Sequence, residues 1–310
     1  MDMQDRRRPP RLQRGDAVAV VAPAGPVPDQ LLETGIDQLQ QWGLQVKVGD
    51  HVRDRHPELD YLAGTDADRA EDLQNAWCDP EVKAVLCARG GYGSMRVLEH
   101  LDWDKMAAAD PKVLVGSSDI TALHDAFAKH LGLVTVFGPM IATKAFTEDE
   151  PAREHLRRTL FEPHSVTALT SPGASALVPG RATGITYGGN LSLLAGALGT
   201  ADAPEPPPQG IALLEDVTEE PYRLDRFVTQ LLRAGWFDNA TGIALGSWVE
   251  CGPLEDVRKM LDDLLGGLGV PVIWELGFGH CPRQLTVPLG TAAELDADER
   301  RLTVLQPALL

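Results

Sequence analysis

Short apolar runs typical of buried strands alternate with helix-like segments through the first half of this 310-residue chain. The expected strands are 17–22, 44–48, 82–88, 112–115 and 133–137, and the expected helices are 29–42, 65–77, 94–101 and 119–130. A strand followed by a helix and then another strand favours a parallel sheet with helices on both faces. The sequence therefore predicts an α/β domain over residues 15–145.

The pattern changes after this domain. Residues 146–180 carry scattered charges and prolines, and we expect a linker there. Further strands are expected at 211–214, 243–249, 272–276, 285–289 and 301–305, with helices at 191–198 and 221–234. This excess of strands predicts a smaller, β-rich α+β domain over residues 181–310. Residues 1–14 include three consecutive arginines, and we expect a flexible tail.

Composition excludes several classes of protein. A hydrophobic content of 44% is enough to bury a core, whereas the net charge of −17 disfavours nucleic acid and anionic membranes as partners. No run approaches the roughly 20 apolar residues of a membrane span, and no secretory signal is recognisable. The four cysteines lack metal-site spacing. We therefore expect a cytoplasmic protein without a metal or another cofactor.

Ser118 follows an expected strand and begins an expected helix, within Gly-Ser-Ser-Asp at 116–119. A tight turn of this kind exposes a nucleophile and leaves nearby backbone amides free. The helix N-terminus also favours a negative charge. We expect the amide of Asp119, together with that of Gly90 or Gly91, to form an oxyanion hole. A simple helix-capping role for the serine remains an alternative.

Glu215 and His280 are the candidate acid and base. Glu215 and Asp216 end an expected strand, where side chains alternate, so only one of them can face a given site. A carboxylate bound to an imidazole fixes its tautomer, and a loop histidine flanked by Gly279 suits a general base. Solvated loop acids and a surface histidine are the alternatives. With Ser118, these groups would support acyl transfer without a metal.

The segment Arg-Gly-Gly-Tyr-Gly at 89–93 could hold an anion, and Arg89 could bind a substrate carboxylate through a forked hydrogen bond. The segment lacks the spacing of a nucleotide-binding loop. We expect Arg89, Tyr92, Asn190 and Tyr222 to contact the substrate. A helix-capping role for Asn190 and a surface helix face around Tyr222 remain alternatives.

Seven motifs between about residues 14 and 305 occur together in a characteristic order. They are Val-Val-Ala-Pro-Ala-Gly at 20–25, Ala-Arg-Gly-Gly-Tyr-Gly at 88–93, Gly-Ser-Ser-Asp-Ile-Thr-Ala-Leu at 116–123, Gly-Gly-Asn-Leu at 188–191, Leu-Glu-Asp at 214–216, Tyr-Arg-Leu-Asp-Arg at 222–226, and Gly-His at 279–280 followed by Leu-Thr-Val-Pro-Leu-Gly at 285–290. With these motifs the chain resembles the LD-carboxypeptidases of murein recycling. That serine peptidase family also includes the microcin C self-immunity peptidases.

The resemblance implies a catalytic triad of Ser118, Glu215 and His280. It also implies that an N-terminal α/β domain bears the serine, that a smaller C-terminal domain bears the acid and the base, and that the site lies at their junction. A homodimer is often found in this family. The chain departs from the family pattern at Ser117, where an aromatic residue commonly precedes the nucleophile.

The implied reaction is hydrolysis of the terminal L-D peptide bond of murein tetrapeptides through an acyl-enzyme, with release of D-alanine. A second hypothesis is an aminoacyl-nucleotide or acyl-sulfamate hydrolase of the microcin-immunity type. The region 140–185 contains only two aromatic residues, Phe146 and Phe161, which disfavours it. A third hypothesis is a non-catalytic ligand-binding protein with a two-domain cleft, and the expected lack of an export signal disfavours a periplasmic one.

Overall fold

The first half of the chain forms the sheet that the alternation predicts. The computed structural model describes residues 6–310. The strands are β1 Ala17–Val21, β2 Gln45–Val48, β3 Val82–Cys87, β4 Val113–Gly116, β5 Thr135–Phe137 and β12 Val287–Leu289. Their order is β12-β5-β4-β3-β1-β2, and β1 to β5 run parallel. The expected parallel α/β domain is confirmed.

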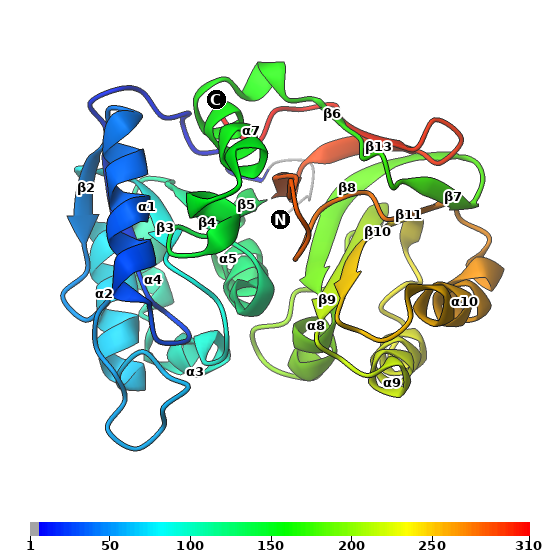
Figure 1. The fold of residues 1–310 in the computed structure, drawn as a ribbon, viewed down its shortest axis with the longest axis horizontal. Helices are drawn as coiled ribbons and strands as arrows, with labels where there is room; N and C mark the ends of the chain where they lie inside the picture. The colour runs from blue at the N-terminus through cyan, green and yellow to red at the C-terminus, as the bar shows by residue number, and fades with distance from the viewer. Residues whose placement is uncertain (1–5) are drawn as a thin grey trace.

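Helices cover both faces of this sheet, as expected (Figure 1). They are α1 Asp29–Gln41, α2 Asp66–Cys78, α3 Ser94–Val97, α4 Trp103–Ala108, α5 Thr121–Leu131, α6 Lys144–Thr147 and α7 Glu150–Phe161. Val18 and Val20 of β1 pack with α1 and α7, whereas Ala19 and Val21 pack with α2 and α5. Within residues 6–310, no helix combines the length and the apolar character that crossing a membrane requires.

The expected linker at 146–180 is wrong for much of its length, because α7 belongs to the first lobe. Phe146, Leu156 and Leu160 are buried in the same core as α1 and β1. The side chain of Asp149 accepts a hydrogen bond from the backbone N–H of Ala152 and caps the helix. The many charges on the exposed side of α7 obscured its apolar stripe.

The second lobe is built on a mixed sheet with the order β6-β14-β13-β8-β9-β10-β11-β7. Its strands are β6 Ala168–Leu169, β7 Ser175–Val178, β8 Arg181–Asn190, β9 Gly210–Val217, β10 Ala240–Val249, β11 Val272–Trp274, β13 Ala292–Asp296 and β14 Arg301–Val304. The central strands β8 to β11 run parallel, whereas the outer strands pair antiparallel. This arrangement confirms the expected β-rich α+β class.

One face of the second sheet carries helices, and the other faces the first lobe (Figure 1). The helices are α8 Leu191–Ala197, α9 Pro221–Arg233 and α10 Leu254–Leu265. On the opposite face, Ile211 and Leu213 share a core with Phe137 and Val287 of the first sheet. The lobes are therefore joined by an apolar interface, with their strand ends close to one another.

The two lobes are also joined by the backbone. Strand β12, expected in the C-terminal domain, pairs antiparallel with β5 of the first sheet. Near the C-terminus, Ala308 and Leu309 lie in the core of the first lobe. The expected C-terminal domain over 181–310 thus contributes two segments to the first lobe.

The expected tail over residues 1–14 is wrong for residues 6–14, and residues 1–5 lie outside the described part of the chain. Arg7 forms a β-bridge with Leu133, and Leu12 is buried. The backbone N–H of Leu310 donates to the carbonyl of Pro9 at 3.0 Å. Pairing with distant segments, which no local pattern reveals, orders this stretch.

Leu309 anchors the C-terminal segment, so its truncation should destabilise the protein. The side chain is 0% exposed, whereas that of the adjacent Leu310 is 61% exposed. We expect Leu309→Ala to lower the free energy of unfolding by about 2–5 kcal/mol, the usual cost of removing a buried leucine side chain. Urea unfolding measures this change. Leu310→Ala is the matched control and should change little, and equal midpoints for the two variants would contradict the assigned packing.

Candidate active site

Ser118 occupies a strained turn between β4 and α5. Its φ is +58°, in the left-handed region that residues with a side chain rarely adopt. A short 3-10 helix, Ser118–Ile120, leads from this turn into α5. Ser117 stands at the N-cap position of that short helix, but its side chain makes no capping hydrogen bond, and α5 begins after Ile120. The structure therefore does not support the helix-capping alternative for either serine.

Gly90 lies directly beside Ser118. A Cβ atom at position 90 would stand 3.2 Å from the Ser118 Oγ and 3.3 Å from the Asp119 backbone nitrogen. Within residues 6–310, the backbone N–H groups of Gly90, Gly91 and Asp119 donate to no protein acceptor. Free amides beside a serine hydroxyl are what an oxyanion hole requires.

The side chain of Asp119 holds the glycine loop against this turn. Its buried carboxylate accepts a hydrogen bond of 2.8 Å from the backbone N–H of Ser94, and the Ser94 hydroxyl donates to the Asp119 carbonyl. Burial raises the pKa of Asp119, although the hydrogen bonds from Ser94 act in the opposite direction. Asp119 thus has a structural role in addition to its free amide.

Glu215 and His280 form a hydrogen-bonded pair. Glu215 lies on β9, is fully buried, and its Oε2 accepts from the His280 Nδ1 at 2.7 Å. A Cβ atom at Gly279 would stand 2.5 Å from this Oε2, so glycine is required there for the close approach. Burial of His280 lowers its pKa, but the charge and hydrogen bond of Glu215 outweigh burial, and the net pKa is raised. With Nδ1 donating, Nε2 is left as the basic nitrogen.

The two neighbouring acids face different partners, as strand alternation predicts. Glu215 binds His280, whereas Asp216 accepts hydrogen bonds from the Asn190 amide at 2.9 Å and the Ser192 N–H at 2.8 Å. Both acids are buried, so the alternative of solvated loop acids is wrong. Burial, and then the charge of Glu215, raise the pKa of Asp216 to about 6.

Asn190 connects this acid–base pair to the serine. Its Nδ2 donates to the Glu215 Oε1 at 3.2 Å, and its backbone N–H donates to the Thr121 Oγ1 at 2.9 Å. Thr121 begins α5, three residues after Ser118. A chain of hydrogen bonds therefore runs from the serine's helix through Asn190 and Glu215 to His280.

Asn190, which we expected to contact the substrate, has its side chain occupied by groups of the protein itself. The residue is 2% exposed, its Nδ2 is shared between two carboxylates, and its Oδ1 accepts from the Leu193 N–H and the Ser192 hydroxyl. Its side chain caps α8, which confirms the alternative prediction. Sequence reasoning missed the wider role of this side chain, and it assigned no role to Thr121, because both act through segments distant in the chain.

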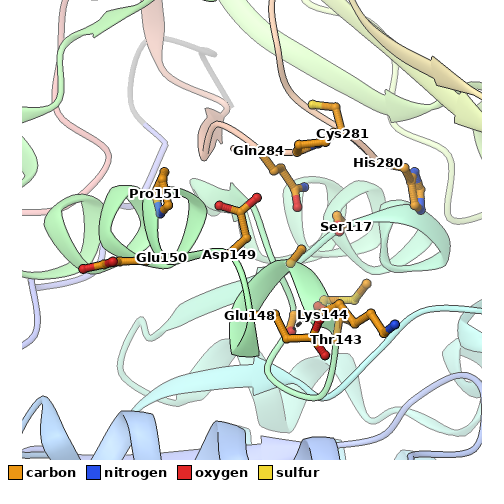
Figure 2. Close-up of a pocket in the computed structure, with 14 residues that line it drawn as sticks. Ser117, Thr143, Lys144, Glu148, Asp149, Glu150, Pro151, His280, Cys281 and Gln284 are labelled. Atoms are coloured by element: carbon orange, nitrogen blue, oxygen red, sulfur yellow. Dashed lines mark hydrogen bonds between the residues drawn. The ribbon is translucent and has the colours of Figure 1, made fainter.

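A cavity of about 640 Å³ opens beside His280 and Ser117 (Figure 2). It is lined by Ser117, Met140, Thr143, Lys144, Ala145, Glu148, Asp149, Glu150, Pro151, Gly279, His280, Cys281, Pro282 and Gln284. Segments after β4, β5 and β11 thus meet here, at the junction of the lobes. The volume suits a small ligand or a peptide side chain.

The other predicted substrate-binding residues lie outside this cavity wall. Arg89 is half-buried, and one of its nitrogens donates to the Pro26 carbonyl at 2.9 Å. Burial and the nearby Arg55 cation lower its pKa. Its Nη2 lies 3.7 Å from the position of a Cβ atom at Gly91, so the guanidinium adjoins the glycine loop and is available to an anion there.

The two predicted tyrosines are exposed. Tyr92 is 50% exposed, and its ring packs edge-on against Tyr61 with 5.7 Å between the ring centroids. Tyr222 is 62% exposed on α9, where the Arg226 guanidinium lies 5.6 Å from the ring centroid. This environment of Tyr222 agrees with the alternative of a surface helix face. Substrate contact by either ring stays a prediction.

The part of the chain that the structure describes contains one group of side chains close enough to share a metal ion. His51, Asp54 and Asp68 have ligand atoms within 4.8 Å of one another. This group includes none of Ser118, Glu215 and His280. Exposed acidic groups commonly lie this close without a metal, and the chemistry that the serine, the imidazole and the free amides can carry out requires none.

Comparison with known proteins finds relatives along almost the whole chain. Residues 18–138 match the LD-carboxypeptidase N-terminal domain, and residues 183–295 match the LD-carboxypeptidase C-terminal domain. A Streptomyces coelicolor protein with a provisional carboxypeptidase name is 59% identical over 99% of both chains. The murein tetrapeptide carboxypeptidase of Pseudomonas aeruginosa is 36% identical, over 92% of this chain and 94% of that protein.

A solved structure of MccF in complex with glutamyl sulfamoyl guanosine has a similar fold. The TM-score is 0.86, and the superposition covers 98% of this chain and 99% of the MccF chain. Because the identity is 23%, this likeness shows the shared fold alone.

Gly279→Ala should disrupt the contact between Glu215 and His280. The added Cβ would collide with the Glu215 Oε2, and a φ of +93° is unfavourable for alanine. With the carboxylate displaced, we expect the pKa of His280 to fall, as measured by NMR titration of its imidazole.

Gly267→Ala is the matched control, because a Cβ atom at that position meets nothing within 4 Å. It should leave the His280 titration unchanged. An unchanged titration in Gly279→Ala would show that the Glu215 contact does not set the His280 pKa.

Proposed function

Because this chain belongs to the LD-carboxypeptidase family, we propose that Ser118, Glu215 and His280 are the catalytic triad of a serine carboxypeptidase that acts on murein peptides. The 2.7 Å hydrogen bond between Glu215 and His280, connected through Asn190 to the serine's helix, carries this proposal. The strained turn at Ser118 supports it, since a nucleophile there is presented away from its helix.

Each step of acyl transfer can be assigned to a group of this chain. The His280 Nε2 takes the hydroxyl proton of Ser118, whose Oγ attacks the scissile carbonyl. The amides of Asp119 and of Gly90 or Gly91 stabilise the oxyanion. His280 then protonates the leaving amine, and a water molecule hydrolyses the acyl-enzyme. Glu215 holds the imidazole in the required tautomer and stabilises its charged form.

Arg89 is our candidate for binding the terminal carboxylate of the substrate. Its guanidinium adjoins Gly91, and a carboxypeptidase must recognise a free chain end close to the attacked bond. A local cation matters here, because the net charge of −17 repels anions from the protein as a whole. We propose that the residue released is the terminal D-amino acid of an L-D bond, D-alanine in murein tetrapeptides.

The competing substrate class, an aminoacyl nucleotide or acyl sulfamate, has less support. Among the described residues, no phenylalanine, tyrosine or tryptophan lines the cavity beside His280, so a nucleobase there would lack a large aromatic side chain to stack on. The expected homodimer and cytoplasmic location stay predictions.

Ser118→Ala should abolish turnover of an L-D tetrapeptide, because no other group replaces the nucleophile. We expect a loss of roughly 10⁴-fold or more in kcat, by analogy with other serine triads. Mass spectrometry of the products, with tetrapeptide and acyl-sulfamate substrates in parallel, measures the activity and its substrate class. The exposed Ser165→Ala is the control and should retain full activity. Activity that survives in Ser118→Ala, or that is lost to a chelator, would contradict the proposal.

The dependence of kcat/KM on pH should follow the protonation of the His280 imidazole. Protonated imidazole cannot accept the serine proton, and the His280 pKa is raised above its ordinary value of about 6.5. We therefore expect kcat/KM to fall as the pH decreases through an apparent pKa above that value. Glu215→Gln removes the raising charge, so the acid limb should move to lower pH while the plateau falls by about 10²–10⁴-fold. An acid limb that does not move would exclude Glu215 as the partner of the base.

A further inference from the structure

Arg69 is a buried cation that the proposed reaction does not use. It lies on α2 and is 1% exposed, and its Nη1 donates to the carbonyl of Pro23 and, at 2.8 Å, to that of Gly93. Its Nη2 donates to the Asp66 carboxylate, whereas its Nε has no partner within residues 6–310. A buried ion pair is often no more stabilising than well-packed apolar side chains, so these contacts indicate a role besides stability.

The two carbonyls that the guanidinium binds belong to segments at neighbouring strand ends. Pro23 follows β1, and Gly93 ends the glycine loop, which follows β3. The N–H of Gly25 also donates to the Gly90 carbonyl at 3.1 Å. The glycine loop is therefore held at two points, near its start by the segment after β1 and at its end by the guanidinium.

The contact at Gly93 also fixes the turn that bears the serine. No peptide bond in the described part of the chain is cis, and in a trans peptide unit the carbonyl of one residue and the N–H of the next point in opposite directions. The Gly93 carbonyl binds Arg69, so the Ser94 N–H points the other way, where it donates to the Asp119 carboxylate at 2.8 Å. Arg69 is thus connected through a single peptide unit to the residue that follows Ser118.

The same geometry orients a free amide at the start of the loop. The Gly90 carbonyl is directed at Gly25, so the Gly91 N–H is directed away from it. Within residues 6–310 no protein acceptor binds that N–H, and the Ser118 hydroxyl lies beside Gly90. A rotation of this peptide unit would replace the donor with a carbonyl oxygen, which repels an oxyanion.

Glycine makes such rotations easy. Gly91 and Gly93 have φ angles of +113° and +126°, and a chain with several glycines has many conformations of similar energy unless other groups fix it. We propose that Arg69 is a positioning residue for acyl transfer, which holds the end of the glycine loop so that the free amides stay directed at the oxyanion. The inference rests on the proposed function and adds to it a group that does not touch the substrate.

Substitution of Arg69 tests the proposal. Arg69→Met removes the bonds to both carbonyls, while Asp66 keeps the Arg96 guanidinium at 2.7 Å as a partner. We expect kcat for an L-D tetrapeptide to fall by roughly 10- to 100-fold, less than the loss of an oxyanion donor itself, with KM nearly unchanged. Arg69→Lys keeps the charge but cannot reach all the acceptors, so its kcat should be intermediate.

A tripeptide boronic acid gives a readout that a merely structural role would not change. The Ser118 Oγ adds to the boron, His280 takes the hydroxyl proton, and the anionic adduct places an oxygen in the oxyanion hole. Its affinity should fall in Arg69→Met by the same factor as kcat, because both depend on the tetrahedral state. The calorimetric affinity of the tetrapeptide, measured in the Ser118→Ala background, should stay the same.

Gly25→Ala tests the other point of attachment without changing a charge. The added Cβ would stand 2.9 Å from the Gly90 carbonyl oxygen and displace it, so kcat and boronate affinity should again fall together. Gly196→Ala is the matched control, because a Cβ atom there meets nothing within 4 Å. Arg96→Met removes the other side-chain cation that binds Asp66 and should also behave as the wild type.

The outcomes distinguish this inference from the proposed function. Wild-type kcat and boronate affinity in folded Arg69→Lys and Gly25→Ala proteins, as judged by urea unfolding, would overturn the role of Arg69, even where Arg69→Met fails to fold. Equal losses of tetrapeptide and boronate affinity would also overturn it, since they would show a general disruption. Activity that survives in Ser118→Ala, or a wild type that releases no terminal residue, would instead contradict the proposed function.

Discussion

The amide of Asn190 is the contact on which the site depends. It donates hydrogen bonds to Glu215 and Asp216, two adjacent buried carboxylates, and burial together with the charge of Glu215 raises the pKa of Asp216. The backbone of the same residue binds Thr121 of the first lobe. One residue at the end of β8 therefore fixes the orientation of the acid that pairs with His280 and relates it to the helix that follows Ser118.

The second constraint on the site is that the backbone must come close to two of its side chains. Gly90 lies beside Ser118 and Gly279 lies beside Glu215, where a Cβ atom would stand 3.2 Å from the Ser118 Oγ and 2.5 Å from the Glu215 Oε2. The serine and the acid–base pair thus lie in separate lobes. A glycine stands at the point where the backbone approaches each of them closely. The strained backbone conformation of Ser118 is tolerated because the hydrogen bond between the Ser94 N–H and the Asp119 carboxylate fixes the turn.

Local sequence predicted strands β1 to β5 and the strand-end position of the site residues, because hydrophobic period and helix signals act over short distances. In the second half of the chain it did not predict β8, α10 or β13. It did not predict that β12 joins the first sheet, that α7 belongs to that lobe, or that residues 6–14 are ordered, since these depend on pairing between distant segments. Asn190 makes one contact that local sequence predicts and another that depends on distant segments. Its capping of α8 follows from its neighbours, whereas its bond to Glu215 requires the folded chain.

The route of the chain around His280 has a mechanical consequence. The loop that bears the imidazole leaves β11 in the second sheet and enters β12 in the first, so its two ends are anchored in different lobes. A rotation of one lobe against the other would therefore move the loop that carries the imidazole. The position of His280 thus depends on how the two sheets are held against each other.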